Sequence, residues 1–168
     1  MERKQFLKNS LAATGLFGFS SMKLIAQPFQ QDPQLDKKLV EEFVGASHRD
    51  MEKTKPLLEE HPTLLNAAHD WKFGDFETGL GAASHVGYKE LARYYIDKGA
   101  QANIFTACLF GKIEIVKAMI TAFPNTMYAK GPHGYTLLHH AQRGGEEARE
   151  VKEYLESLGC KETRFKIY

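Results

Sequence analysis

Apolar residues recur at helical spacing along three segments of this chain, and each segment follows a glycine. The residues that form this pattern are Leu91, Tyr94, Tyr95 and Ile96, then Ile115, Val116, Met119 and Ile120, then Val151, Tyr154, Leu155 and Leu158. Apolar side chains three and four positions apart share one face of a helix, which can then pack on a core. Shorter segments rich in small residues precede the glycines at positions 87, 111 and 145. The pattern therefore predicts pairs of short helices joined at glycine turns.

A fourth and more degenerate copy of this pattern lies upstream. It runs from Phe43 into the residues after Asp50, which takes the place of the turn glycine. Turn positions then fall at 50, 87, 111 and 145, in steps of 37, 24 and 34 residues. The long first step predicts extra residues in the segment 66–77, and the short second step leaves little room for a hairpin after Gly99. We also expect an irregular turn around residues 144–148.

The segment from Gly134 to Gly145, with the sequence GYTLLHHAQRGG, resembles the ankyrin signature. In that signature, Gly-x-Thr-Pro-Leu-His-x-Ala opens a helix–turn–helix repeat of about 33 residues. The resemblance implies an all-α ankyrin-repeat solenoid of about four helix–turn–helix repeats over residues 39–160, with short β-hairpin-like fingers. It also implies that the motif histidine ties together the backbone of neighbouring turns. The residues that it assigns to the structural motif are Gly87, Gly99, Gly111, Thr136, His139 and Gly145.

The N-terminus has the layout of a secretory signal, with a charged start followed by an apolar stretch rich in Gly and Ala. We expect a signal peptide over residues 1–26, a linker over 27–38 and a short tail over 161–168. The string from Arg3 to Lys8 resembles a twin-arginine signal in which Lys4 replaces the second arginine. General secretion is the alternative route, and an uncleaved N-terminal helix of a cytoplasmic protein is the alternative to export. The apolar run is too short to span a bilayer, which takes about 20 residues.

The composition of the chain argues against nucleic acid as a partner and bears on whether the two cysteines form a disulfide bond. The chain has 22 basic and 21 acidic residues and a net charge of +1, which gives no footprint for nucleic acid. It contains two cysteines, and an exported protein could pair them. We instead expect Cys108 to be a small buried hydrophobe, far from Cys160 in the repeat array.

The ankyrin resemblance also implies where a partner binds, namely on the fingertips and on the exposed face of the first helices. It places His133 and Tyr135 on the finger before the last repeat, and a longer finger before the second repeat. The longer finger contains Trp71, Phe73, Asp75, Phe76 and Glu77, together with Asp70 and Lys72. Aromatic residues on loops of a rigid scaffold are frequent recognition elements. The alternative is that Trp71 and Phe76 fold back onto the repeat core as a cap.

No motif in the sequence indicates catalysis. The chain lacks a Gly-x-Ser-x-Gly elbow, a phosphate-binding glycine loop and a His-Glu-x-x-His helix. His133 with Asp75 or Glu77 could form a metal site if the fingers met. Because the sequence has no helical His-x-x-x-His pair, we expect neither a metal site nor a cofactor, and we expect that the protein is not an enzyme.

These expectations combine into one functional prediction. The chain is predicted to be an exported bacterial ankyrin-repeat protein, periplasmic or otherwise outside the cytoplasm, that binds an unidentified protein partner as a rigid scaffold. Neither nucleic acid nor a stable membrane insertion after leader removal is expected. The alternatives are an exported metal- or cofactor-associated protein and a cytoplasmic ankyrin adaptor.

Overall fold

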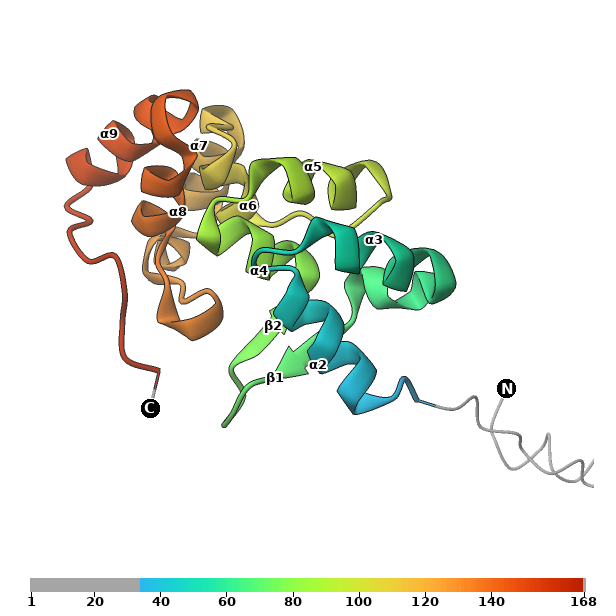
Figure 1. Ribbon diagram of the computed structural model, residues 1–168. Helices are drawn as coiled ribbons and strands as arrows, with labels where there is room; N and C mark the ends of the chain where they lie inside the picture. The colour runs from blue at the N-terminus through green and yellow to red at the C-terminus, as the bar shows by residue number, and fades with distance from the viewer. Residues whose placement is uncertain (1–33, 168) are drawn as a thin grey trace, which may run out of the picture. The chain divides into compact units, whose positions relative to one another are not determined.

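The computed structural model describes residues 34–167 of the chain, and this part is mostly helical (Figure 1). Successive helices contact one another in pairs. The pairs are α2 (Lys37–Ala46) with α3 (Met51–Glu60), α4 (Gly79–Val86) with α5 (Lys89–Asp97), α6 (Ile104–Leu109) with α7 (Ile113–Ala122), and α8 (Leu137–Gly144) with α9 (Arg149–Ser157). The first helix of each pair also contacts the first helix of the next, in the order α2, α4, α6, α8.

Shorter elements connect the helix pairs. A two-stranded antiparallel sheet of β1 (Ala68–Asp70) and β2 (Phe76–Thr78) pairs His69 with Glu77 and lies between α3 and α4. The 3-10 turns are η1 (Pro62–Asn66), η2 (Pro124–Tyr128), η3 (Pro132–Gly134) and η4 (Gly145–Ala148). The hairpin lies where the long first step predicted extra residues, and η4 is the irregular turn expected around residues 144–148. No strand follows Gly99 in the described chain, as the short second step predicted.

Side-chain caps explain where most of the helices begin. The side chains of Asp36, Asp50, Thr78, Asn103 and Thr136 each accept a backbone N–H from the first turn of α2, α3, α4, α6 and α8, respectively. Glycines with positive φ end the helical segments at positions 87, 99, 111 and 145, as the turn pattern predicted. Gly87 is the clearest case, because it caps α4 with φ of +82°.

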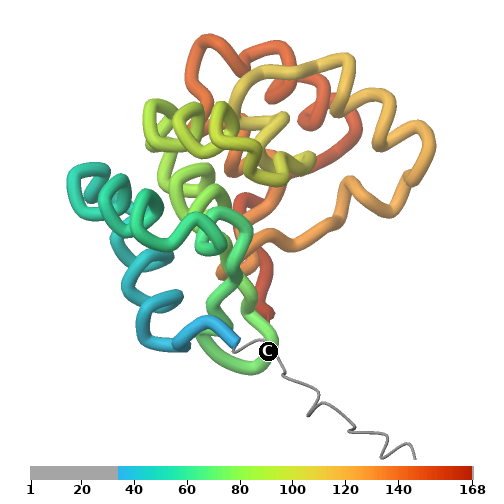
Figure 2. The backbone as a smooth tube through the Cα atoms, turned by 90° about the vertical axis from the view of Figure 1, so that its right-hand side faces the viewer, coloured from blue at the N-terminus to red at the C-terminus, as the bar shows by residue number. Residues whose placement is uncertain are grey.

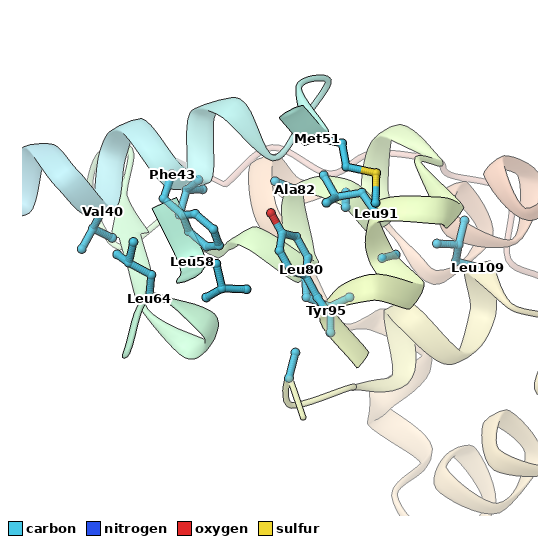
Figure 3. Packing of buried hydrophobic residues seen from close by; sticks show 14 of the residues in the cluster. Val40, Phe43, Met51, Leu58, Leu64, Leu80, Ala82, Leu91, Tyr95 and Leu109 are labelled. Carbon is cyan, nitrogen blue, oxygen red and sulfur yellow. The ribbon is translucent and has the colours of Figure 1, made fainter. Parts of the chain in front are cut away.

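The buried apolar side chains form two clusters. The first gathers residues of α2 to α5 together with Leu109 of α6, and Figure 3 shows the ring of Tyr95 beside Leu80 within it. Tyr95 also packs against Phe43 with a centroid separation of 5.6 Å, and its hydroxyl lies 2.7 Å from Ser47 Oγ. The second cluster gathers residues of α6 to α9, including Leu137 and Leu155. Each cluster therefore draws on more than one helix pair, and α6 contributes to both.

The predicted signal peptide, linker and C-terminal tail compare with the structure in different ways. The predicted signal peptide lies outside the described residues, and α2 begins at Lys37, inside the segment predicted as linker. The C-terminal segment is not a separate tail, because Thr163 O accepts a hydrogen bond from Thr136 N at 3.1 Å and Phe165 N donates to Gly134 O at 2.8 Å. Figure 2 shows this segment descending beside the β1–β2 hairpin.

Both cysteines are free, and Cys108 is buried as predicted. The expectation that they are far apart was wrong, because Cys160 packs against the same hydrophobic cluster that contains Cys108. Burial, with a smaller contribution from Cys160, raises the pKa of the Cys108 thiol to about 12. None of the helices within residues 34–167 is long and apolar enough to cross a membrane.

Candidate functional site

The hairpin loop between β1 and β2 is held by its own hydrogen bonds and presents two phenylalanines to solvent. Trp71 N donates to Asp75 O at 3.1 Å, and Gly74 N donates to Asp70 Oδ1 at 3.0 Å. Phe73 is 84% exposed and Phe76 is 62% exposed. The backbone of Phe73 has φ of +52°, a left-handed conformation that bulky residues rarely adopt. The loop is therefore ordered, and its most exposed aromatic residue occupies a strained position.

Two acidic residues on the inner side of this hairpin are buried. Asp75 is 5% exposed and accepts two hydrogen bonds from His133, one from the backbone N at 2.7 Å and one from ring Nδ1 at 2.8 Å. Because His133 belongs to η3, these bonds join the two segments that were predicted as separate fingers. A metal site was possible from the sequence only if the two fingers met, and the structure shows that these two segments do meet.

Glu77 is 1% exposed and lies at the centre of three imidazole rings. Its Oε1 is 3.0 Å from His85 Nε2, and its Oε2 is 3.4 Å from both His48 Nε2 and His133 Nε2. Trp71 Nε1 donates a hydrogen bond to Oε2 at 2.7 Å. The ring centroids of His48 and His133 lie 5.0 and 5.2 Å from that of His85. We call His48, Glu77, His85 and His133 the histidine–carboxylate cluster.

Four elements supply this cluster, and three of its parts are far apart in the sequence: position 48, positions 77 to 85, and position 133. His48 lies in the turn after α2, Glu77 lies on β2, His85 is in the last turn of α4, and His133 is in η3. The φ of +57° at His133 turns its backbone N–H and its ring toward the same Asp75 carboxylate. The cluster therefore forms only when the hairpin, α4 and η3 are all in place.

Hydrogen bonds at the outer nitrogens determine which ring atoms face Glu77. His48 Nδ1 lies 3.1 Å from both Val44 O and Gly45 O, and a carbonyl can only accept, so the proton is on Nδ1. His133 Nδ1 likewise faces the Asp75 carboxylate. Each of these two rings therefore directs its Nε2 toward the Glu77 carboxylate.

The charge on Glu77 is retained despite its burial. Burial raises the pKa of this carboxyl, but the His85 and His48 rings and the Trp71 hydrogen bond outweigh that effect and bring its pKa below the ordinary value. A buried carboxylate requires positive charge nearby. Two buried atoms, Glu77 Oε1 and His85 Nε2, lack an aligned hydrogen bond although they lie 3.0 Å apart. The cluster can accommodate a shared proton or a cation.

The other predicted residues divide between the core and the surface. Trp71 is half-buried and packs against the first hydrophobic cluster, so the alternative of a cap is confirmed for Trp71. It is wrong for Phe76, which is exposed. Tyr135 is half-buried and stacks on His139 with a centroid separation of 4.0 Å. His139 Nε2 donates to His85 O at 2.8 Å. This bond joins α8 to α4, the first helix of the second pair, and not to a helix of the neighbouring third pair.

The sequence prediction did not include His48 and His85 in a site, although a signal for them is present. Both end the same tripeptide, Ala46-Ser47-His48 and Ala83-Ser84-His85. The two histidines are 37 residues apart, which equals the step between the turn positions 50 and 87. Because α2 contacts α4, the tripeptide duplicated near the ends of these two helices could have predicted the pair.

Comparison of the sequence with protein-family models and with curated proteins gave no match.

Proposed function

We propose that this chain is a helical repeat scaffold of the ankyrin type that binds a protein partner through its β1–β2 hairpin loop. One observation carries the proposal: Phe73 is 84% exposed while its backbone has φ of +52°. A left-handed conformation at a non-glycine residue costs about 1–2 kcal/mol. Local backbone strain and exposed aromatic rings on an ordered loop are both common at recognition sites, and together they support this assignment.

Several features of the fold support the repeat part of the proposal. The helices contact in successive pairs, and α2, α4, α6 and α8 contact in chain order. Gly87 and Gly111 have positive φ of 82° and 60° at equivalent turns. These are the contacts that stacked helical repeats use to bury apolar faces that no single pair covers.

The hairpin is suited to binding because it is already ordered. Its loop is held by bonds from Trp71 N to Asp75 O and from Gly74 N to the Asp70 carboxylate. A preorganised loop loses little conformational entropy when a partner binds. Phe73 and Phe76 would supply the apolar contact area that aromatic residues contribute at interfaces. The mechanism is binding by a rigid surface, without catalysis.

The location of the protein follows from the leader rather than from the fold. We propose that the chain is exported from a bacterial cytoplasm and that its leader ends near residue 26. The charged start and the Gly/Ala-rich apolar stretch of the sequence support this assignment. N-terminal sequencing of the protein from its native host checks it. A mature start near residue 27 is expected, and an intact Met1 would support the cytoplasmic adaptor instead.

Affinity capture with cross-linking tests the binding proposal. The full chain is used as bait in an envelope extract of the native host, alongside a Phe73→Ser/Phe76→Ser variant. A Phe123→Ser variant is the matched control, because Phe123 is 66% exposed but lies after α7, away from the hairpin. We expect a specific partner with the wild type and the control and its loss with the hairpin variant. Equal capture by all three proteins, or no specific partner for the wild type, would contradict the proposal.

A further inference from the structure

We propose that the histidine–carboxylate cluster is a binding site for a divalent transition-metal ion, with zinc as the expected ion. His48, Glu77, His85 and His133 each offer one ligand atom, and these atoms all lie within 4.8 Å of one another. Imidazole nitrogens and a carboxylate oxygen are ligands that suit zinc, nickel and copper. This site is separate from the exposed face of the hairpin and does not depend on a protein partner.

The outer contacts of the histidines match those of metal-binding histidines. Such histidines usually donate their second ring N–H to a carboxylate or a backbone carbonyl, which fixes the ring and its tautomer. His48 Nδ1 lies 3.1 Å from the carbonyls of Val44 and Gly45, and His133 Nδ1 lies 2.8 Å from Asp75 Oδ2. The Asp75 carboxylate is in turn held by the His133 backbone N–H at 2.7 Å. These hydrogen bonds at the second ring nitrogens are an observation separate from the short distances between the four ligand atoms, and both point to a metal site.

The inner atoms lack the partner that a metal ion would provide. The Nε2 atoms of His48 and His133 converge on Glu77 Oε2 at 3.4 Å, a separation longer than that of a well-formed hydrogen bond. Glu77 Oε1 and His85 Nε2 are buried without an aligned hydrogen bond. Trp71 Nε1 donates to Oε2 at 2.7 Å, and the remaining lone pairs of the carboxylate are available to an ion. One metal ion would satisfy all of these atoms together.

The dimensions and the access of the site are compatible with zinc. Tetrahedral zinc with bonds of about 2.0–2.1 Å needs ligand atoms roughly 3.3–3.5 Å apart. His85 Nε2 lies 3.0 Å from Glu77 Oε1, and the Nε2 atoms of His48 and His133 lie 3.4 Å from Glu77 Oε2. All four ligand atoms lie within 4.8 Å of one another, so rotation of these side chains toward a common centre would complete the arrangement. The side chains of His48 and His133 are 23% and 22% exposed. A cavity of about 680 Å³ lined by Trp71, Asp75 and His133, among others, gives an ion access from solvent.

The test is zinc titration of the full chain, purified without a histidine tag and stripped with a chelator. Competition with a chromophoric chelator at pH 7.5 should give about one tightly bound Zn²⁺ per chain. Tight binding should disappear in a His48→Gln/His133→Gln variant, with at least a 100-fold loss of affinity. Asp75→Asn should weaken binding by about 10- to 100-fold, because it removes an outer contact. Mg²⁺, which prefers oxygen ligands, should not compete.

A matched histidine variant controls for nonspecific binding by imidazole. His61 lies beside Glu60 with its side chain 38% exposed and takes no part in the cluster, so His61→Gln should bind zinc like the wild type. Trp71 gives a second readout, because it is the only tryptophan in the sequence and its ring centroid lies 6.0 Å from that of His133. Stoichiometric Ni²⁺ should therefore change the fluorescence of the wild type and of His61→Gln.

Two results would overturn the proposal. One is a wild type that binds zinc no more tightly than the double variant, which would mean that the cluster holds only protons. The other is unchanged Trp71 fluorescence with one Ni²⁺ bound, which would place the ion elsewhere. Circular dichroism of each variant establishes that it is folded, and the Trp71 readout on wild-type protein stands even if the double variant does not fold.

Discussion

The carboxylate of Asp75 accepts two hydrogen bonds from His133, a residue 58 positions later in the chain, at 2.7 Å from its backbone N and 2.8 Å from its ring Nδ1. The pair joins the β1–β2 hairpin to η3. It also accounts for the left-handed backbone of His133, whose φ of +57° places both donors on one carboxylate. A single acidic side chain thus holds together two segments that the sequence suggests are separate.

Asp75→Asn should therefore destabilise the fold. An amide in the same place can accept the backbone N–H but cannot also accept well from the ring, and hydrogen bonds to a charged group contribute about 1.5–3 kcal/mol. We expect the free energy of unfolding in urea to fall by about 1–2 kcal/mol. Asp97→Asn is the control, because Asp97 is exposed at the end of α5, and it should change stability by less than about 0.5 kcal/mol. Equal effects of the two substitutions would show that the Asp75–His133 contact is energetically unimportant.

Trp71 and Phe73 should respond in opposite ways to truncation. Trp71→Ala removes a half-buried ring from the first hydrophobic cluster and the hydrogen bond to ionised Glu77, and it should cost about 2–4 kcal/mol of unfolding free energy. Phe73→Ala removes a ring that is 84% exposed and should change stability by less than about 0.5 kcal/mol. Thermal and urea denaturation of the two variants checks this contrast. A stable Trp71→Ala protein would return Trp71 to the surface residues that the sequence predicted for partner binding.

Alanine substitutions at two glycines distinguish the cost of backbone strain from the cost of a steric clash. Gly111 and Gly159 have φ of +60° and +90°, so alanine is strained at both. A Cβ at Gly111 would lie 2.0 Å from Glu147 O, whereas nothing lies within 4 Å of a Cβ at Gly159. Gly159→Ala should cost about 1 kcal/mol, and Gly111→Ala should cost at least about 2 kcal/mol more because α6 and η4 must separate. Similar melting temperatures for the two variants would contradict the close approach of these elements.

His140 should make stability depend on pH between about 4 and 6.5. Its burial lowers the pKa of the imidazole to about 4, against 6.5 for an ordinary histidine, and the hydrogen bond from Nδ1 to Thr136 O only partly offsets this. Below pH 6.5 the unfolded chain binds a proton that the folded chain rejects, so stability falls as the pH decreases. The loss between pH 7 and pH 4.5 is about 2–3 kcal/mol for a shift of this size.

Urea unfolding of the wild type and of His140→Leu at the two pH values measures this contribution. The variant loses the hydrogen bond to Thr136, so its stability at pH 7 falls, but its loss on acidification should be smaller by about 2–3 kcal/mol. His139 acts in the same direction, because burial also lowers its pKa, so part of the pH dependence persists in the variant. An unchanged pH dependence in His140→Leu would mean that His140 is hydrated in the folded state.

The helix pairs could be predicted from the sequence because their signals are local. Apolar periodicity, capping side chains such as Asp50 and turn glycines such as Gly87 act within one or two helical turns. They gave the helical segments and the irregular turn near residue 145. The contact of the C-terminal segment with Gly134 could not be predicted, because it consists of a few backbone hydrogen bonds between residues without periodicity.

The site could be predicted only in part. Asp75, Glu77 and His133 were identified as finger residues, but the sequence does not show that the two fingers meet. That approach depends on the path of the chain between residues 78 and 132. His48 and His85 carried a signal in the repeated Ala-Ser-His tripeptide, yet that signal becomes meaningful only once α2 and α4 are known to pack side by side.

Some helix pairs that are not adjacent in sequence contact each other, and this affects whether a pair can be deleted without destabilising the rest. His139 bonds the backbone of His85, and Lys89 pairs with Glu147 at 3.0 Å, so α8 and η4 bond directly to α4 and α5 and bypass α6 and α7. In an array held only by neighbouring contacts, terminal units can be deleted or duplicated one at a time. Here, deletion of the last helix pair would also remove partners from the second pair. The chain should consequently unfold in a single cooperative transition and resist the stepwise shortening that regular repeat arrays tolerate.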